Sequence, residues 1–330
     1  MPEIRILSEA ELRRAIGLDA DAVDCVEQAF RLLATTDVVM PPILGFDVPD
    51  HNGEVDVKTA YVPGIESIAL KVSTGFFDNP KLGLPSLSGL MVLFSAKTGQ
   101  VEAVLLDNGY LTDIRTAAAG AVAAKWLSRE DCKTAGIIGS GLQARLQLKA
   151  LTLIRPIERA LIWGRDETKA VECAAELARE LGIDVSAAAT IDDVMKVSDI
   201  VVTTTPSTEP LVLASHLRPG MHITAMGSDA EHKVEIDPAA LAAADLYVCD
   251  RVAQCRTRGE LRAALEVLAF GEHQQWPELG EIIAGKTPGR SDNNQVTICD
   301  LTGTGVQDTA IATLARQRAL SAEAGLSFES

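Results

Sequence analysis

From residue 135 onward, short apolar runs alternate with longer stretches in which apolar residues recur at helical spacing. The apolar runs predict strands at Ala135–Ile138, Ala160–Trp163, Asp184–Ala187, Ile200–Thr204, His222–Met226, Leu246–Cys249 and Val296–Cys299. Amphipathic stretches such as Glu167–Leu181 and Ile191–Val197 lie between them and predict helices. Repeated β–α units of this length indicate a doubly wound parallel sheet with helices on both faces.

The first part of the chain has a different pattern. Ala20–Leu33 has the spacing of an amphipathic helix, and short extended runs separated by turn residues follow it. These runs are Val55–Val57, Ser67–Val72, Gly89–Ser95 and Val101–Asp107. The pattern predicts an α+β domain with a mostly antiparallel sheet.

These two patterns also predict the domain boundaries. A long helix expected at Thr112–Leu127 connects the two parts, and the tail from Asp308 to Leu320 is again helical by pattern. We predict a first domain over residues 1–118, joined by a C-terminal helix over residues 312–330, and a second domain over residues 119–311. The predicted fold class is therefore α/β, with a separate α+β domain.

The segment Gly-Ser-Gly-Leu-Gln-Ala at residues 139–144 stands between a predicted strand and a predicted helix. In this context G-x-G-x-x-(G/A) indicates a Rossmann dinucleotide site. The first glycine permits a tight turn, the second lets the backbone approach a pyrophosphate, and N–H groups at the helix start favour phosphate. We expect the cofactor to contact Gly139, Ser140, Gly141, Leu142 and Gln143.

The position that distinguishes NAD from NADP is ambiguous. An acidic residue is expected at the end of the second strand, but Gly164 stands there and is followed by Arg165 and Asp166. Arg165 could bind a 2′-phosphate and favour NADP, whereas Asp166 could bind the ribose hydroxyls and favour NAD. Both cofactors remain open on these residues alone.

Composition narrows the class of protein. An apolar fraction of 47% and a charged fraction of 23% are typical of soluble globular proteins, and a net charge of −16 disfavours nucleic acid and anionic membranes as partners. No apolar run is long enough to cross a bilayer, so we expect a cytoplasmic protein. The six cysteines and five histidines lack metal-ligand spacing, so we expect reduced thiols and no metal site.

Several segments together resemble the ornithine cyclodeaminase/μ-crystallin family, in the same order along the whole chain. They are Leu70–Val72, Leu111–Ala118, the glycine loop, Gly227–Asp229 and Leu301–Thr309. Within the family the chain is most similar to the ectoine-utilisation cyclodeaminase-like branch, which includes iminosuccinate reductases. The resemblance implies a homodimer with a Rossmann domain and a separate dimerisation and substrate domain. It also implies hydride chemistry at a carbon bonded to nitrogen, or NAD(P)H binding without known turnover, and it favours NAD.

Two cations are candidates for catalysis. Lys71 lies in an apolar strand, where it either faces water from a sheet edge or faces the active site. Arg115 lies near the start of a helix, where it either pairs with Asp107 or Asp113 or binds a carboxylate in a bidentate fork. The resemblance places substrate-contacting residues at both positions.

Asp229 is the third catalytic candidate. It follows the predicted strand His222–Met226, and ligands bind at such strand ends in a doubly wound sheet. It resembles the family's catalytic aspartate, which would interact with the substrate nitrogen or relay a proton. The alternative is a capping role for the residues from Ala230 onward.

Two further residues are candidates for substrate binding. Many family members carry an uncharged residue where Lys58 stands, and a third cation beside Lys71 and Arg115 suits a dicarboxylate. The alternative is an exposed lysine on a strand. Asp56 would orient water or an amine, or would simply pair with Lys58 or Lys71.

The remaining candidates concern the cofactor. We expect Thr203, Thr204 and Thr205 to line its adenosine side, and Met226, Gly227, Ser228 and Gly303 to contact it near the nicotinamide. Together with these residues, the resemblance implies a reductase that uses NADH to convert iminosuccinate, a small dicarboxylic imine, to aspartate. The alternatives are a cyclodeaminase that recycles NAD and a μ-crystallin-like protein that binds NADPH and a small ligand.

Overall fold

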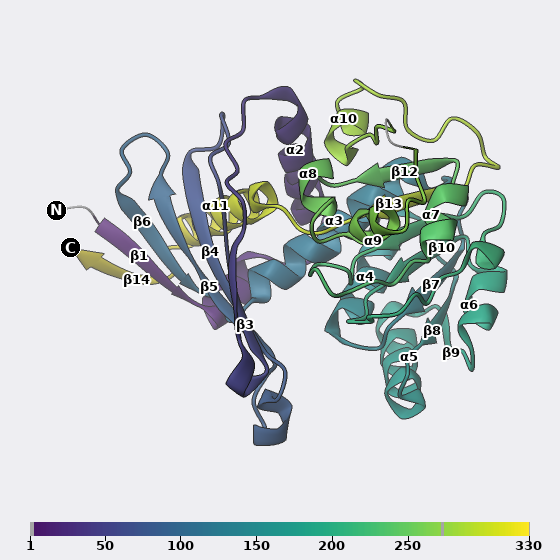
Figure 1. Ribbon diagram of the computed structural model, residues 1–330. Coiled ribbons are helices and arrows are strands. Elements are labelled where there is room, and N and C mark those ends of the chain that lie inside the picture. The colour runs from purple at the N-terminus through teal and green to yellow at the C-terminus, as the bar shows by residue number, and fades with distance from the viewer. Residues whose placement is uncertain (1–2, 272–273, 330) are drawn as a thin grey trace. The chain divides into compact units, whose positions relative to one another are not determined.

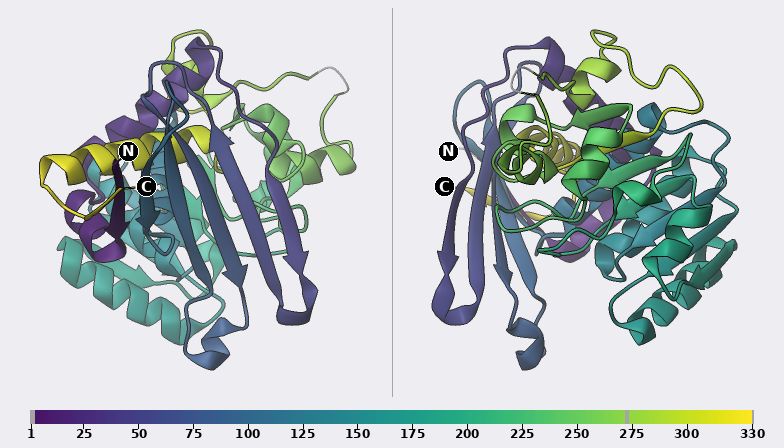
Figure 2. Two further views of the ribbon diagram at one scale, coloured as in Figure 1. Left: turned by 90° about the vertical axis from the view of Figure 1, so that its left-hand side faces the viewer. Right: turned by 45° about the vertical axis from the view of Figure 1, so that its right-hand side comes forward.

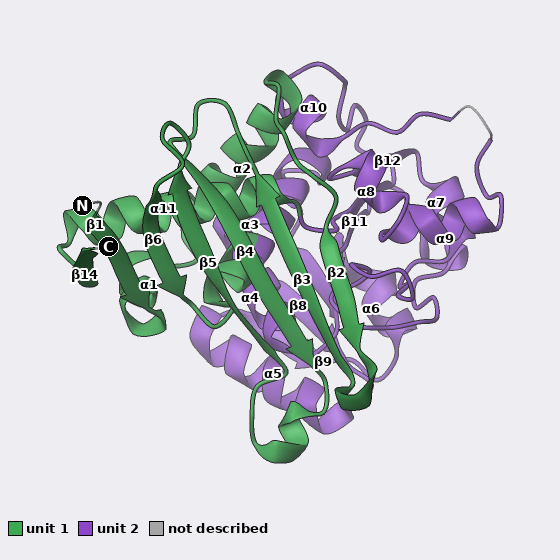
Figure 3. Cartoon of the chain, turned by 60° about the vertical axis from the view of Figure 1, so that its left-hand side comes forward, with its two compact units in different colours: residues 1–115, 304–330 green, residues 116–303 purple. Residues whose placement is uncertain are grey.

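The structure is a computed structural model that describes residues 3–271 and 274–329 (Figure 1). The chain forms two compact units, which are coloured separately in Figure 3. Unit 1 comprises residues 1–115 and 304–330, and unit 2 comprises residues 116–303. The units therefore join at 115/116 and 303/304, whereas the sequence predicted joins at 118/119 and 311/312. The second difference arises because the last long helix belongs to unit 1 from its first turn.

Unit 2 contains a parallel sheet of seven strands in the order β12-β13-β11-β10-β7-β8-β9. The strands are β7 (Thr134–Ile138), β8 (Arg159–Trp163), β9 (Asp184–Ala187), β10 (Ile200–Thr203), β11 (His222–Ala225), β12 (Leu246–Cys249) and β13 (Thr297–Asp300). The helices are α4 (Leu142–Ile154), α5 (Glu167–Leu181), α6 (Ile191–Val197), α7 (Pro238–Ala243), α8 (Val252–Cys255), α9 (Glu260–Glu266) and α10 (Leu279–Ile283), with a 3₁₀ turn, η3, at Ala214–His216. This order confirms the predicted Rossmann-type sheet.

Two apolar cores cover the two faces of this sheet. One includes Leu148 of α4 and Leu177 of α5, and the other includes Val194 of α6 and Leu261 of α9. Strand order reverses between β7 and β10, so the loops that follow these two strands leave side by side. In open parallel sheets this reversal point is where ligands bind.

Unit 1 contains a second seven-stranded sheet, in the order β14-β1-β6-β5-β4-β3-β2. Its strands are β1 (Glu3–Ser8), β2 (Leu44–Val48), β3 (Gly53–Ala60), β4 (Ser67–Phe76), β5 (Leu87–Ser95), β6 (Val101–Leu106) and β14 (Leu326–Glu329). Its helices are α1 (Glu9–Ala15), α2 (Ala20–Thr35) and α11 (Gly305–Ser321), with 3₁₀ turns η1 (Pro49–His51) and η2 (Asn79–Leu82), while α3 (Tyr110–Leu127) runs on into unit 2. Among the described strands of this sheet only β1 and β6 pair in parallel, so the predicted mostly antiparallel sheet is confirmed.

The C-terminal helix predicted over residues 312–330 is wrong in its last part. Helix α11 ends at Ser321, and Leu326–Glu329 instead form an edge strand antiparallel to β1. Gly325 has a φ of +89°, a left-handed conformation that favours glycine and redirects the chain before this strand. The strand was missed because its pairing partner lies at the opposite end of the sequence.

Helix α11 packs along one face of the unit 1 sheet, against β3, β4 and β5, and also contacts α1 and α2 (Figure 2). Residues on this face of the strands, such as Ala69, Met91 and Leu105, are fully buried. The opposite face carries apolar side chains that are only partly buried, among them Val57 and Val72. Unit 1 therefore has one closed face and one open apolar face.

Candidate functional site

Lys58 and Lys71 are directly opposed in the register of β3 and β4. Strand β4 lies between β3 and β5 in the interior of the sheet, so the alternative of an edge lysine facing water is wrong for Lys71. Lys71 is 2% exposed and Lys58 is 8% exposed, so Lys58 is not an exposed strand lysine either. Both side chains lie on the face that α11 covers, because they share it with Met91 in the strand register.

Asp308, on α11, connects the catalytic candidates of unit 1. Its Oδ1 accepts a hydrogen bond from Nε of Arg115 at 2.9 Å, and its Oδ2 lies 3.2 Å from Nζ of Lys71. Nη1 of Arg115 also donates to Oε1 of Gln307 at 3.2 Å. The structural alternative in the sequence is a pair with Asp107 or Asp113, whereas the Nε hydrogen bond of Arg115 goes to Asp308. Arg115 lies in the second turn of α3.

The sequence reasoning missed Asp308 and Gln307 as individual site residues. Both are fully buried on a helix whose other residues at this end are small or apolar, and a charged residue in such a place is rare unless it is paired. A charged residue among small and apolar helix residues was therefore the signal that could have identified Asp308 as a site residue. The partner of Asp308 could not be found from it, because Arg115 is 193 positions away along the chain.

The charges of this cluster affect one another strongly. Burial lowers the pKa of Lys71 to about 7, with contributions from the nearby cations Arg115 and Lys58, although Asp308 acts in the opposite direction. Burial alone would raise the pKa of Asp308, but Arg115, Lys71 and Lys58 together hold it below its usual range. Asp308 is therefore an anion that three cations stabilise, and Lys71 can exchange its proton near neutral pH.

Asp56 lies two residues before Lys58 on β3 and so projects from the same face of the strand. It is opposite Ser73 of β4, whose Oγ donates to the main-chain oxygen of Asp56 at 3.4 Å. Asp56 is partly buried. The structure thus places Asp56, Lys58 and Lys71 on one face of two neighbouring strands.

Asp229 belongs to unit 2, in the loop after β11. Its side chain is 52% exposed, and its Oδ1 lies 2.6 Å from Nζ of Lys233. Residues 229–235 form a loop, so the alternative of a helix cap at Ala230 is wrong. The preceding Ser228 is buried and donates to the main-chain oxygen of Lys233 at 2.8 Å, which closes this loop.

The glycine loop has the geometry that a dinucleotide requires. Gly139 has a φ of +129°, and a Cβ there would lie 2.3 Å from Oγ1 of Thr204. Gly141 is exposed, and a Cβ there would meet no atom within 4 Å. Helix α4 starts at Leu142 without a side-chain cap and without an acidic residue in its first turn. Its first N–H groups therefore have no intrahelical acceptor and can bind a pyrophosphate.

The other loop residues lie around this helix start. Leu142 is 56% exposed, and Oε1 of Gln143 accepts from Nε2 of Gln147 at 3.2 Å. The main-chain oxygen of Ser140 accepts from Arg145 at 2.6 Å. These hydrogen bonds attach the loop to helix α4, and Gly141 stays exposed to solvent.

The end of β8 explains why glycine replaces the expected acidic residue. A Cβ at Gly164 would lie 2.7 Å from Oγ of Ser140, so the backbone approaches the glycine loop closely. Arg165 is exposed, whereas Asp166 caps α5 by accepting from the main-chain N–H of Lys169 at 3.2 Å. Both side chains are exposed, but part of the Asp166 carboxylate is already used to cap the helix.

The three threonines at the end of β10 and directly after it have different surroundings. Thr203 is fully buried and donates its hydroxyl to Glu235 at 2.7 Å, and Thr205 donates both its main-chain N–H and its hydroxyl to Glu235 at 2.6 Å. The hydroxyl of Thr203 is therefore used internally. Thr204 instead lies against Gly139.

Two buried carboxylates that the sequence did not single out support the loops expected to contact the cofactor. Glu235 also accepts from the N–H of Gly227 at 2.7 Å, and so ties the loop after β10 to the loop after β11. Asp250 accepts from the N–H of Gly303 at 2.8 Å, where Gly303 has a φ of +79°. Met226 is buried, and its sulfur accepts from Gln147 at 2.7 Å. The expected contact residues are thus held by neighbours of their own unit.

Two features of unit 2 lie outside these loops. Three buried residues, Cys249, Cys255 and Asp300, could hold a metal ion, because their two sulfur atoms and a carboxylate oxygen lie within 4.8 Å of one another. The expectation of no metal site therefore stays a prediction. Burial raises the pKa values of both thiols.

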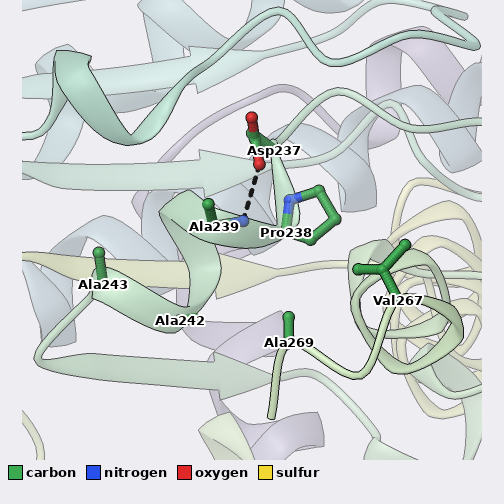
Figure 4. A pocket seen from close by; sticks show the side chains of 7 residues that line it. All are labelled: Asp237, Pro238, Ala239, Ala242, Ala243, Val267 and Ala269. Carbon is green, nitrogen blue, oxygen red and sulfur yellow. Dashed lines mark hydrogen bonds between the residues drawn. The ribbon is translucent and has the colours of Figure 1, made fainter.

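A pocket of about 660 Å³ is formed around α7, but alanines and Pro238 dominate its wall and Asp237 caps the helix there (Figure 4).

Among the described residues, no helix is both long enough and apolar enough to cross a membrane.

Comparison with known proteins defines the family. The profile of the Ornithine cyclodeaminase/mu-crystallin family matches residues 3–323, so the chain belongs to this family. The Sinorhizobium fredii protein called uncharacterized cyclodeaminase y4tK is 58% identical, with 100% of both chains covered. The Iminosuccinate reductase of Paracoccus denitrificans is 32% identical over 93% of this chain and 94% of its own length.

Solved structures agree with this assignment. The Δ1-pyrroline-2-carboxylate reductase of Thermococcus litoralis, in complex with NADH and L-proline, superposes with a TM-score of 0.92 at 31% identity, covering 98% of this chain and 99% of that one. An archaeal alanine dehydrogenase dimer with bound NAD gives 0.92 at 33% identity, covering 99% of both. The Paracoccus denitrificans iminosuccinate reductase with NAD⁺ gives 0.91 at 30% identity, covering 99% of this chain and 100% of that one.

Proposed function

We propose that the protein is an NADH-dependent imine reductase that converts iminosuccinate to aspartate. The observation that carries this proposal is the buried pair Lys58 and Lys71, which are directly opposed on β3 and β4. The positive charges of Lys58 and Arg115 both act on Lys71 and lower its pKa. Like charges directly opposite each other in a sheet are destabilising, and more so when they are buried. An anionic substrate would remove this repulsion when it binds.

The arrangement favours two carboxylates over one. Asp308 already contacts Lys71 and Arg115, and these two cations are sufficient to hold the carboxylate next to the imine carbon. Lys58 adds a third cation on the neighbouring strand. A second carboxylate on the substrate would be attracted by the positive charge of Lys58, whereas a second amine would be repelled by it.

The proposed chemistry is a reduction of the C=N bond: iminosuccinate, NADH and a proton yield aspartate and NAD⁺. The nicotinamide cofactor supplies the hydride when it is bound, and the open helix start at Gly141 fits its pyrophosphate. Lys71 and Arg115 orient the substrate by its carboxylate, and Lys71 can release a proton near neutral pH. We propose that Asp229 supports the protonated nitrogen and that Asp56 orients water or the amine.

The relatives support the same class of reaction. Their names describe reductases of imines next to a carboxylate, and a dehydrogenase that acts on an amino acid. The three solved relatives described above are named with NADH, NAD or NAD⁺, which supports NAD for this chain. Arg165 would allow NADP to bind as well.

The test is an NADH oxidation assay with four substrates: oxaloacetate plus ammonia, which forms iminosuccinate, pyruvate plus ammonia, Δ1-pyrroline-2-carboxylate and ornithine. The same assay with NADPH measures cofactor preference. We expect the highest kcat/KM with iminosuccinate and NADH. Equal activity with the pyruvate imine would contradict the dicarboxylate assignment, and proline formed from ornithine without net NADH change would indicate a cyclodeaminase. Cofactor binding with no turnover of any substrate would indicate a binding protein.

A further inference from the structure

We propose that the first turn of α11 forms a carboxylate subsite, in which Gln307 and Thr304 bind the substrate carboxylate that Arg115 also holds. The proposal rests on the proposed function only in that the substrate carries a carboxylate next to the imine carbon. It assigns roles to two residues that are not charged and that no motif for hydride transfer requires.

The first observation is a pair of buried donors without acceptors. Thr304 and Gln307 are both fully buried, and among the described residues neither Oγ1 of Thr304 nor Nε2 of Gln307 has a hydrogen-bond partner. An unpaired buried polar group costs about 1–3 kcal/mol, so two in one helical turn call for an explanation. A ligand that accepts hydrogen bonds would satisfy both.

The second observation is the orientation of the Gln307 amide. Its Oε1 accepts from Nη1 of Arg115 at 3.2 Å, so the amide lies beside the guanidinium and its NH₂ group is the end left over. A primary amide has one accepting and one donating end, and Arg115 uses the accepting one. The group that remains can only donate, which selects an anion and rejects an ammonium group.

The third observation is the helix start itself. Helix α11 has 17 residues, and its N-cap Thr304 makes no side-chain cap hydrogen bond. The main-chain N–H of Gln307 donates to the oxygen of Thr304 at 3.2 Å, whereas Gly305 and Val306 precede the first residue whose N–H can bond within the helix. The helix dipole adds partial positive charge at this end. A Cβ at Gly305 would lie 2.5 Å from the main-chain oxygen of Thr59, so glycine lets this turn come close to β3 directly after Lys58.

These groups share one preference. The hydroxyl of Thr304 can donate, the amide of Gln307 donates, Arg115 donates, and the helix start attracts negative charge. Asp308 is the anion in this turn, and its oxygens are in contact with Lys71 and Arg115. The chemical class that fits is a carboxylate, which accepts several hydrogen bonds at two oxygens.

The test measures binding rather than turnover. Calorimetric titration of the protein saturated with NAD⁺ is carried out with succinate, with propionate and with the uncharged propionamide. In Gln307→Met and in Thr304→Val we expect affinity for succinate and propionate to fall by a similar factor, about ten- to a hundredfold for a hydrogen bond to a charged group. Propionamide binding should change little.

Matched controls are available on the same helix. Gln317→Met alters an exposed glutamine that pairs with Glu66, and Thr313→Val removes a hydroxyl that already donates to the main-chain oxygen of Thr309. Both controls should keep propionate affinity. Gln307→Glu is a second test, because it places a negative charge beside the ligand and should weaken propionate more than Gln307→Met does.

The outcomes separate this proposal from the proposed function. If Gln307→Met and Thr304→Val keep propionate affinity, or weaken NAD⁺ binding instead, the carboxylate subsite is wrong. If Lys58→Met fails to weaken succinate selectively, the dicarboxylate assignment is wrong while the subsite stands. Circular dichroism of each variant identifies any that fails to fold. If Gln307→Met or Thr304→Val does not fold, weaker propionate binding by Gln307→Glu supports the carboxylate subsite, and unchanged binding contradicts it.

Discussion

Lys58 and Lys71 face each other across strands β3 and β4, and both are buried although they carry the same charge. Such an arrangement is unfavourable on its own, and it persists because Asp308 and the rest of the unit hold it in place. An anionic ligand would reduce the electrostatic repulsion between the two lysines when it binds. The predictions below follow from this pair and from the glycine loop.

Lys58→Met should weaken a dicarboxylic substrate selectively. If Lys58 and the second carboxylate form a desolvated charge pair, its loss costs about 2–3 kcal/mol, or roughly 30- to 150-fold in kcat/KM. Activity with the pyruvate imine should change much less. Steady-state kinetics with both substrates measures the split, and an equal loss with both would show that Lys58 does not distinguish them.

Succinate binding should weaken as the pH rises through about 7. Burial lowers the pKa of Lys71 to about 7, so its cationic form is present below that pH and is lost above it. Titrations of the NAD⁺-saturated protein between about pH 6 and 9 measure this dependence. Lys71→Arg serves as the control, because arginine stays protonated and should flatten the profile. A flat wild-type profile would contradict the assignment.

Asp308→Asn should destabilise unit 1 strongly at neutral pH. It leaves Lys71 and Arg115 buried beside an uncharged amide, and breaking a buried ion pair costs about 3–5 kcal/mol. Because the pKa of Asp308 is lowered on folding, its stabilisation is complete above the unfolded value of about 3.9 and is lost as the pH falls through the folded one. Urea unfolding at several pH values tests this, with exposed Asp37→Asn as control. Equal stability of wild type and variant at neutral pH would contradict it.

Two glycine variants should separate folding from cofactor binding. Gly139→Ala is expected to destabilise unit 2, because φ is +129° and the new Cβ would lie 2.3 Å from Thr204. Gly141→Ala meets no atom within 4 Å, so it should fold normally but obstruct the pyrophosphate and weaken NADH binding. Thermal unfolding and NADH fluorescence titration measure the two effects. Full NADH affinity in a folded Gly141→Ala protein would show that the cofactor does not approach there.

The open face of the unit 1 sheet predicts a homodimer. Val57 and Val72 stand on it, partly buried and without a covering helix from the described residues of unit 1, and a solved relative is described as a dimer. Val72→Lys should shift the protein toward monomer in sedimentation equilibrium. Val267→Lys, at an exposed apolar position in unit 2, is the control. A monomeric wild-type protein at micromolar concentration would contradict this prediction.

Local features were predictable from the sequence because their physical causes are local. The strand, glycine turn and helix around residues 134–154 are encoded by neighbouring residues, and so are the alternating elements that gave the Rossmann-type sheet. Strands β1, β2 and β14 were missed. Strands β1 and β14 pair with each other from opposite ends of the chain, and β2 is a largely exposed edge strand. An exposed edge strand lacks the apolar alternation that marks a buried one.

The sequence by itself determined the strand, glycine turn and helix around residues 139–144, and it identified Lys58, Lys71 and Arg115 as the cations to examine. Only the tertiary structure decided that the two lysines are opposed and buried, because strand register depends on pairing across the sheet. It alone brought Asp308 and Gln307 to Arg115, from a helix at the other end of the chain. Charge interactions depend on distance in space, and no spacing along the sequence specifies that distance.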